Sequence, residues 1–120
     1  MLYERFLNSV KITSIDREKL ADALSTIVRN LKQQHPEIRS VFLFGSFARG
    51  DYTPESDIDI LIVCSHLEVP FLLRSGIFIE FFRPLPFDVN LLVYTEEEIR
   101  RMGEERNPFI LAVFAEAKEI

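Results

Sequence analysis

The 120-residue chain lacks the marks of several protein classes. Its single cysteine, Cys64, cannot form an internal disulfide, and its place at the end of an apolar run predicts a small buried side chain. The chain has 14 Lys and Arg but 19 Asp and Glu, which gives a net charge of −5. A negative charge is unfavourable for binding the phosphates of long nucleic acid. No apolar run approaches the ~18 residues of a membrane span, and no basic-then-apolar leader opens the chain. We therefore expect a cytoplasmic protein that binds neither membranes nor long nucleic acid.

The apolar content is sufficient for one core. At 48% hydrophobic residues, a chain of this length forms a single domain over residues 1–120, and no second core can be built from it. Helical periodicity predicts a helix over Ser14–His35, capped by Ser14 or Asp16. The first 13 residues fit either a helix or a short arm. Strands are predicted at Ile38–Phe44, Asp57–Cys64 and Pro86–Tyr94, and further helices at Ser46–Arg49, Val69–Phe82, Thr95–Glu104 and from Asn107 onward.

The most informative feature is Gly45-Ser46, followed after ten residues by the Asp-x-Asp of Asp57 and Asp59. Side chains alternate along a strand, so these two carboxylates point the same way, roughly 7 Å apart. At an effective dielectric of about 20 they repel by roughly 2 kcal/mol. A hard divalent cation relieves this repulsion, and Mg²⁺ binds carboxylates together with substrate phosphates. The alternative is a solvated strand end.

A third carboxylate, Asp88, lies near the start of the next predicted strand. If that strand pairs beside Asp57, at about 4.8 Å, Asp88 completes a cluster with Asp57 and Asp59. Three such carboxylates suit a two-metal site for phosphoryl displacement. Otherwise Asp88 is an ordinary aspartate at a strand start.

The turn before the acidic strand offers contacts for phosphate. Gly45 is either a plain turn glycine or a position where the backbone approaches a triphosphate closely. The N–H groups at the start of Ser46–Arg49 can hold an anion. Arg49 is the nearest cation, and it either contacts phosphate or is simply exposed.

The pattern of Gly-Ser, ten residues, Asp-x-Asp and a later strand aspartate resembles the polymerase β-related nucleotidyltransferase superfamily. Within it, the chain is most similar to the minimal nucleotidyltransferase (MNT) proteins, most strongly over residues 38–63. The resemblance implies the polymerase β-like fold, of the α/β (α+β) class, with a small mixed sheet flanked by helices. Phe47 departs from the pattern, because many relatives carry a cation there.

The resemblance also implies roles for the site residues. Asp57 and Asp59 would share two Mg²⁺ ions, one of which arrives with the nucleotide. Asp88 would bind the other ion and accept the nucleophile's proton. Ser46 would donate its hydroxyl or N–H to a β- or γ-phosphate.

The implied reaction is transfer of AMP from ATP to a hydroxyl group. MNT proteins commonly pair with a helical HEPN toxin, so the resemblance implies an antitoxin that adenylylates a tyrosine of that toxin. Two other functions stay open. One is a small-molecule nucleotidyltransferase like those that modify aminoglycosides, and the other is a non-catalytic antitoxin that masks its partner.

Phenylalanine is abundant, with 11 residues, and four of them lie at Phe78, Phe81, Phe82 and Phe87. They either form the core beneath the sheet or leave an exposed apolar patch for a partner. Phe81 and Phe82 are consecutive, so they are not expected to face one core together. We therefore predict a partner-binding patch here.

Overall fold

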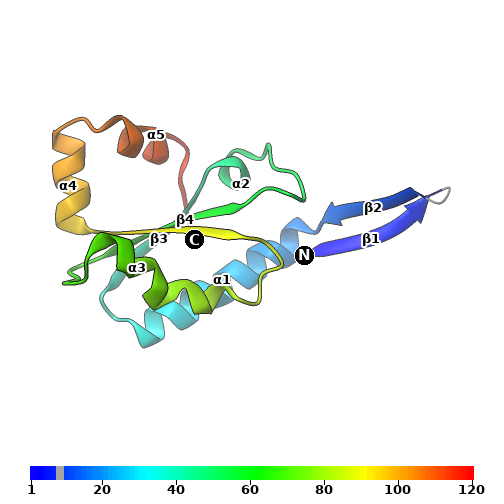
Figure 1. Cartoon of the computed structure of the whole chain (residues 1–120), viewed down its shortest axis with the longest axis horizontal. Helices are drawn as coiled ribbons and strands as arrows, with labels where there is room; N and C mark the ends of the chain where they lie inside the picture. Colours follow the sequence, from blue (N-terminus) through cyan, green and yellow to red (C-terminus); the bar gives the residue numbers. More distant parts are fainter. Residues whose placement is uncertain (8–9) are drawn as a thin grey trace.

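The computed structural model describes residues 1–7 and 10–120, and Figure 1 shows the arrangement of its elements. The strands are β1 (Leu2–Leu7), β2 (Val10–Ile15), β3 (Ile38–Phe44), β4 (Ile58–Cys64), β5 (Val89–Thr95) and β6 (Lys118–Glu119). The helices are α1 (Arg17–Gln34), α2 (Ser46–Arg49), α3 (Phe71–Phe78), the 3₁₀ segment η1 (Ile79–Phe82), α4 (Glu96–Glu104) and α5 (Pro108–Glu116). None of the helices in these described ranges is long and apolar enough to cross a membrane.

A four-stranded mixed sheet organises the chain, in the order β5-β4-β3-β6. β4 and β5 are parallel, whereas β3 is antiparallel to both β4 and β6. The parallel pair requires a crossover connection, which α3 and η1 provide on the face that α1 also covers (Figure 1). α5 lies on the opposite face. The predicted mixed sheet flanked by helices is therefore present.

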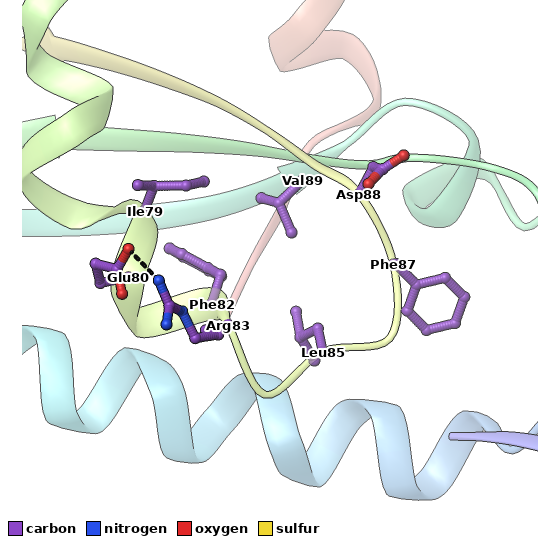
Figure 2. Close-up of a pocket in the computed structure, with 8 residues that line it drawn as sticks. All are labelled: Ile79, Glu80, Phe82, Arg83, Leu85, Phe87, Asp88 and Val89. Atoms are coloured by element: carbon purple, nitrogen blue, oxygen red, sulfur yellow. Dashed lines mark hydrogen bonds and ion pairs between the residues drawn. The ribbon is translucent and has the colours of Figure 1, made fainter.

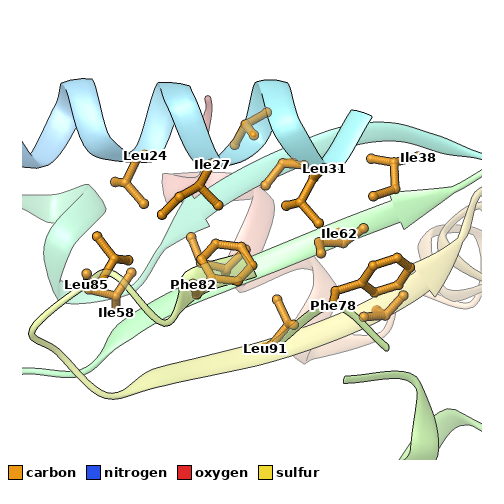
Figure 3. Packing of buried hydrophobic residues seen from close by; sticks show 14 of the residues in the cluster. Leu24, Ile27, Leu31, Ile38, Ile58, Ile62, Phe78, Phe82, Leu85 and Leu91 are labelled. Atoms are coloured by element: carbon orange, nitrogen blue, oxygen red, sulfur yellow. The ribbon is translucent and has the colours of Figure 1, made fainter. Parts of the chain in front are cut away.

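The side chains of β4 alternate between two apolar clusters. Ile58, Ile60 and Ile62 belong to the larger cluster, beneath α1 and η1, and Figure 3 shows how that cluster interdigitates. Leu61 and Val63 belong to the smaller cluster, which includes Val113 of α5. Because the alternation continues to the start of the strand, the odd-numbered aspartates lie on the face that α5 covers.

The predicted helix starts are largely correct. The Asp16 side chain accepts a hydrogen bond from the Lys19 N–H, so α1 begins after Asp16 rather than at Ser14. Thr95 and Glu98 form the predicted capping box of α4. The Asn107 side chain caps α5, with proline at its first position.

Two segments differ from the sequence expectations. β1 and β2 pair antiparallel, with Leu2 opposite Ile15, and extend beyond the four-stranded sheet (Figure 1), so the arm alternative holds. A four-residue spacing of apolar residues repeats on a helix face and also on a strand face, which is why the sequence left both open. β6 was not predicted, because two polar residues carry no strand pattern.

The argument that Phe81 and Phe82 cannot face one core together is wrong. Phe78 and Phe82 are buried in the larger cluster, and Phe81 packs against that same cluster. Successive residues of a 3₁₀ segment are about 120° apart, so Phe81 can flank the core while Phe82 enters it. The Phe81 ring meets the His35 ring edge-on at 5.7 Å. Among the residues whose exposure is described, the exposed large apolar ones lie instead on α3 and α5, at Phe71, Leu72, Leu73, Ile77, Phe109, Leu111 and Phe114.

The single cysteine, Cys64, is buried in the core. Cys64 is inaccessible at the end of β4, and this burial raises the pKa of its thiol to about 11. The thiol therefore stays protonated at neutral pH, and Cys64 serves as an apolar filler, as the sequence predicted.

Candidate active site

The acidic residues gather where β4 and β5 begin. The parallel register pairs Asp59 with Asn90, and the Ile58 N–H donates to the Asp88 carbonyl at 2.8 Å. Extending that register by two residues sets Asp57 beside Asp88. Paired residues on neighbouring strands share a face, so Asp57, Asp59, Asp88 and Asn90 all face the α5 side of the sheet.

Asn90 joins the two predicted ligand carboxylates. Its amide Nδ2 donates to Asp59 Oδ1 at 3.0 Å and lies 3.3 Å from Asp57 Oδ2. These contacts bring Asp57 and Asp59 to one point, as the alternation of β4 predicted. Asn90 itself was missed by the sequence argument. The same alternation applied to β5 identifies it, because it lies two residues after Asp88.

Asp88 lies at the edge of this group. Figure 2 shows it where the chain rises into β5, with Val89 extending from the other side of the strand. It is exposed, and it shares with Asp57 the rim of a cavity of about 350 Å³ between residues 54–57 and 85–88. Asp88 therefore stands next to Asp57, with open space in front of both.

Gly45 forms the tight contact between the turn and the acidic strand. Its φ of 72° lies in the left-handed region. A Cβ at this position would overlap Asp59 Oδ2 and lie 3.1 Å from Asp59 Cγ. Both backbone angle and space therefore require glycine, and the Gly45-Ser46 turn sits directly against the Asp59 carboxylate.

Replacing Gly45 with alanine is expected to displace the turn or the Asp59 carboxylate. We expect the free energy of unfolding to fall by roughly 1–3 kcal/mol, and nucleotide-dependent activity to fall by about 10²-fold, since ångström-scale misplacement costs that much. Urea unfolding and a transfer assay measure the two effects. Gly76→Ala is the matched control, because a Cβ at Gly76 in α3 meets nothing within 4 Å and should stabilise the helix by up to about 1 kcal/mol. Equal behaviour of the two variants would contradict the tight contact.

Phe47 anchors the turn to the core. It is buried, stacks on Tyr52 with ring centroids 4.4 Å apart, and meets the Phe87 ring edge-on at 5.3 Å. Apolar packing thus accounts for a phenylalanine at the position where the family resemblance led us to expect a cation. Ser46 opens α2 immediately after Gly45, and so stands at the head of the turn.

Arg49 pairs with two carboxylates through its Nε and NH1. Its NH1 donates to Glu116 Oε2 at 3.0 Å and to Glu116 Oε1 at 3.2 Å, and its Nε donates to Asp51 Oδ2 at 3.1 Å. These hydrogen bonds, first the one with Glu116, raise the pKa of the already cationic guanidinium. Asp51 is thus a second partner of Arg49. Glu116 was not foreseen, because 67 residues separate it from Arg49.

The donor set fits a magnesium ion that arrives with a nucleotide. Within the part of the chain that the structure describes, no group of three or more His, Cys, Asp or Glu side chains is close enough to hold a metal. Mg²⁺, however, is commonly held by one or two carboxylates, with substrate phosphates and waters completing its shell. Asp57 and Asp59, drawn together by Asn90, supply two such carboxylates. Participation of Asp88 as a third ligand stays a prediction.

The fold and the site together define a nucleotidyl-transfer enzyme: a mixed sheet whose Gly-Ser turn abuts paired aspartates on the next strand. The chain belongs to the nucleotidyltransferase domain family, whose model matches residues 24–116. This confirms the superfamily and the polymerase β-like fold that the sequence predicted.

Two curated relatives come from Methanocaldococcus jannaschii. "Putative protein adenylyltransferase MJ0604" is 57% identical over 42 residues, which are 34% of this chain and 42% of the relative. "Putative protein adenylyltransferase MJ0141" is 40% identical over 58 residues, covering 48% of this chain and 52% of the relative. The matched segments therefore span only about half the length of these relatives.

Solved structures show the same fold. A "putative nucleotidyltransferase" from Sulfolobus solfataricus aligns with a TM-score of 0.57 at 32% identity, over 70% of this chain and 74% of that one. A chain of a toxin-antitoxin structure with AMP-PNP aligns with a TM-score of 0.58 at 22% identity, over 79% and 69%. A chain of an MntA-HpeT toxin-antitoxin mutant aligns at 0.56 and 19%, over the same shares. At identities this low, the last two establish the shared fold alone.

Proposed function

We propose that this chain transfers AMP from Mg-ATP to a tyrosine hydroxyl on a protein partner, a toxin of the HEPN type, and thereby acts as its antitoxin. The tyrosine oxygen forms a bond to the α-phosphate, the bond between the α- and β-phosphates breaks, and pyrophosphate leaves. The observation that carries the reaction is the contact of the Gly45 turn with Asp59, because a backbone that binds phosphate would lie there against a carboxylate that binds metal. The names of the two archaeal relatives support adenylyl transfer to protein. The toxin-antitoxin structures that share the fold support the kind of partner.

The proposed roles follow from the position of each group. Asp57 and Asp59 would hold Mg²⁺, with two ions in the complete site, and bound Mg²⁺ supplies positive charge against the charge that builds up on the phosphates. Asn90 keeps the two carboxylates together. Ser46 donates to the β- or γ-phosphate, and Arg49 contacts the same end of the triphosphate.

Asp88 is proposed to orient the acceptor hydroxyl and take its proton. It is exposed and faces the same open cavity as Asp57, so a side chain from another molecule can reach it. The cavity has a mainly polar lining, in which Glu55 and Ser56 lie beside the two aspartates, with Pro54, Leu85, Pro86 and Phe87 around them. This open, polar position beside Asp88 supports an acceptor hydroxyl presented by a partner.

The test is an intact-mass measurement. The chain is mixed with a co-purified or co-expressed partner and Mg-ATP, and the partner's mass is followed with fragment mapping of the modified residue. One or more adenylyl additions on a partner tyrosine, lost with Asp59→Asn, are expected. A stable complex with no mass change would replace the proposal with masking. Adenylylation of a small hydroxylated molecule without any partner would replace it with a small-molecule transferase.

A further inference from the structure

Glu116, the last residue of α5, contacts the Gly45-Ser46 turn. Glu116 Oε1 accepts a hydrogen bond from the Gly45 N–H at 3.1 Å, and both of its carboxylate oxygens accept from Arg49 NH1. Glu116 is 71 residues from Gly45 in sequence, so only the tertiary fold creates this contact. A single carboxylate thus engages a backbone donor and a cation of the turn at once.

These donors are of the kind that bind phosphate. Backbone N–H groups and a guanidinium donate to phosphate oxygens in the same way as to a carboxylate, since both are charged oxygen acceptors. The Gly45 N–H is one donor, and it cannot serve Glu116 and a phosphate together. Arg49 is also held by Asp51 through its Nε. A triphosphate that approaches this turn therefore meets a negative group already in place.

The backbone of Glu116 is held while its side chain is partly free. The two residues of β6 pair with β3, with Lys118 opposite Leu43 and Glu119 opposite Phe42, and the Ile120 N–H donates to the Val41 carbonyl at 2.9 Å. The same strand β3 leads into the Gly45 turn. The Glu116 side chain is 27% exposed, so a rotation about its own bonds can carry it to solvent.

We propose that Glu116 is an intramolecular competitor of the triphosphate, occupying the position of a phosphate oxygen in the nucleotide-free chain and rotating away when nucleotide binds. The proposal rests on the proposed nucleotidyl transfer and adds a regulation of that site. Only ligands with phosphates that reach the turn compete with Glu116. Its removal therefore strengthens the binding of triphosphates and leaves AMP, whose single phosphate does not reach the turn, unchanged.

The experiment is calorimetric titration of the full chain with ATP, AMP and inorganic tripolyphosphate, each in the presence of Mg²⁺. Glu116→Gln keeps the size of the side chain and removes its charge. We expect the Kd for ATP and for tripolyphosphate to fall roughly threefold to fivefold, as expected for loss of one partly exposed ion pair, with the Kd for AMP unchanged. Glu116→Ala, which also removes the hydrogen bond from Gly45, should lower the two Kd values at least as much.

Two controls separate this effect from general electrostatics. Glu119→Gln removes the same charge three residues further on, at an exposed position of β6, and should leave all three Kd values unchanged. Asp51→Asn releases only the Nε of Arg49 and leaves both Arg49 NH1 and the Gly45 N–H bonded to Glu116, so it should give a smaller gain than Glu116→Gln. An equal gain from Glu119→Gln, or weaker ATP binding by Glu116→Gln, would overturn the proposal; the second result would make Glu116 a residue that positions Arg49.

Failure of the proposed function gives a different pattern. If neither the wild-type chain nor Glu116→Gln binds ATP, nucleotide transfer is rejected, and tripolyphosphate then decides the role of Glu116 by itself. If Glu116→Gln binds tripolyphosphate more tightly than the wild-type chain does, Glu116 occupies a phosphate-binding position. Equal tripolyphosphate binding by the two proteins would reject that role of Glu116. Thermal unfolding of each variant checks that the fold is retained.

Discussion

Asp59→Asn is expected to lower adenylyl transfer by at least about 10²–10³-fold while the chain stays folded. Asp59 is the carboxylate against which the Gly45 turn packs, and it also accepts a hydrogen bond from Asn90. Asparagine keeps the shape and an oxygen acceptor but removes the charge that would hold Mg²⁺ against the triphosphate. Steady-state transfer to the partner, with Mg²⁺ varied, measures the loss.

The folded state of this variant should be as stable as the wild type, or slightly more so. Asp57 and Asp59 are drawn to one amide, so neutralising one of them relieves their repulsion. Asp22→Asn is the matched control, because Asp22 is exposed on α1, which covers the opposite face of the sheet from the acidic residues. Retention of more than about a tenth of the activity by Asp59→Asn would exclude Asp59 from a metal-binding role.

Arg74→Met is expected to be the most destabilising single substitution outside the apolar core. Arg74 is only 6% exposed, and it donates to the Val69 and Val93 carbonyls at 2.7 and 3.2 Å. It also forms a two-pronged ion pair with Glu98, at 2.6 and 3.2 Å. One guanidinium thus ties α3, β5 and α4 together, and its removal leaves carbonyls and a carboxylate without their donor. The free energy of unfolding should fall by about 3 kcal/mol.

Arg100→Met is the control for this loss. Arg100 lies on the exposed face of α4 and pairs with Glu97 and Glu104, so it also has two carboxylate partners but no buried carbonyls. Exposed ion pairs contribute little because solvent and salt screen them, so urea unfolding should show a much smaller loss of stability for Arg100→Met than for Arg74→Met. Equal losses for the two arginines would mean that burial of Arg74 adds nothing.

The loss of stability caused by Arg74→Met should depend on pH. The hydrogen bond from Arg74 is the main cause that lowers the pKa of Glu98 below its ordinary 4.5. A carboxyl with a lowered folded-state pKa adds stability above the unfolded pKa, and that stability is lost as pH falls through the folded value. The difference between wild type and Arg74→Met should therefore be largest at neutral pH and shrink below about pH 4.5. A constant difference across that range would contradict the ion pair.

The features of the fold that the sequence predicts correctly are those that depend on local interactions. The capping box of Thr95 and Glu98 and the Asn107-Pro108 start of α5 were predicted correctly, because caps depend on residues within one turn of each other. The shared direction of Asp57 and Asp59 follows from strand alternation alone. Asn90 was within reach of the same rule. For the first 13 residues the sequence allows both a helix and an arm, since their apolar spacing fits both periods.

The residues that sequence reasoning missed act over long separations. Glu116 and Arg74 look like ordinary surface charges in the sequence, and only their long-range partners reveal their roles. Phe81 and Phe82 were misjudged because the segment tightens into a 3₁₀ turn, a choice made by packing against α1 and His35. No local pattern encodes such contacts.

By itself, therefore, the sequence determined the nucleotidyltransferase family, the mixed sheet and the acidic strand, because motif spacing and alternation are local properties of the chain. Tertiary structure alone decided that Glu116 covers the Gly45 turn, that Asn90 draws the aspartates together and that the exposed apolar residues lie mainly on α3 and α5. The physical reason is that these features depend on which distant segments the fold brings within hydrogen-bond or van der Waals distance.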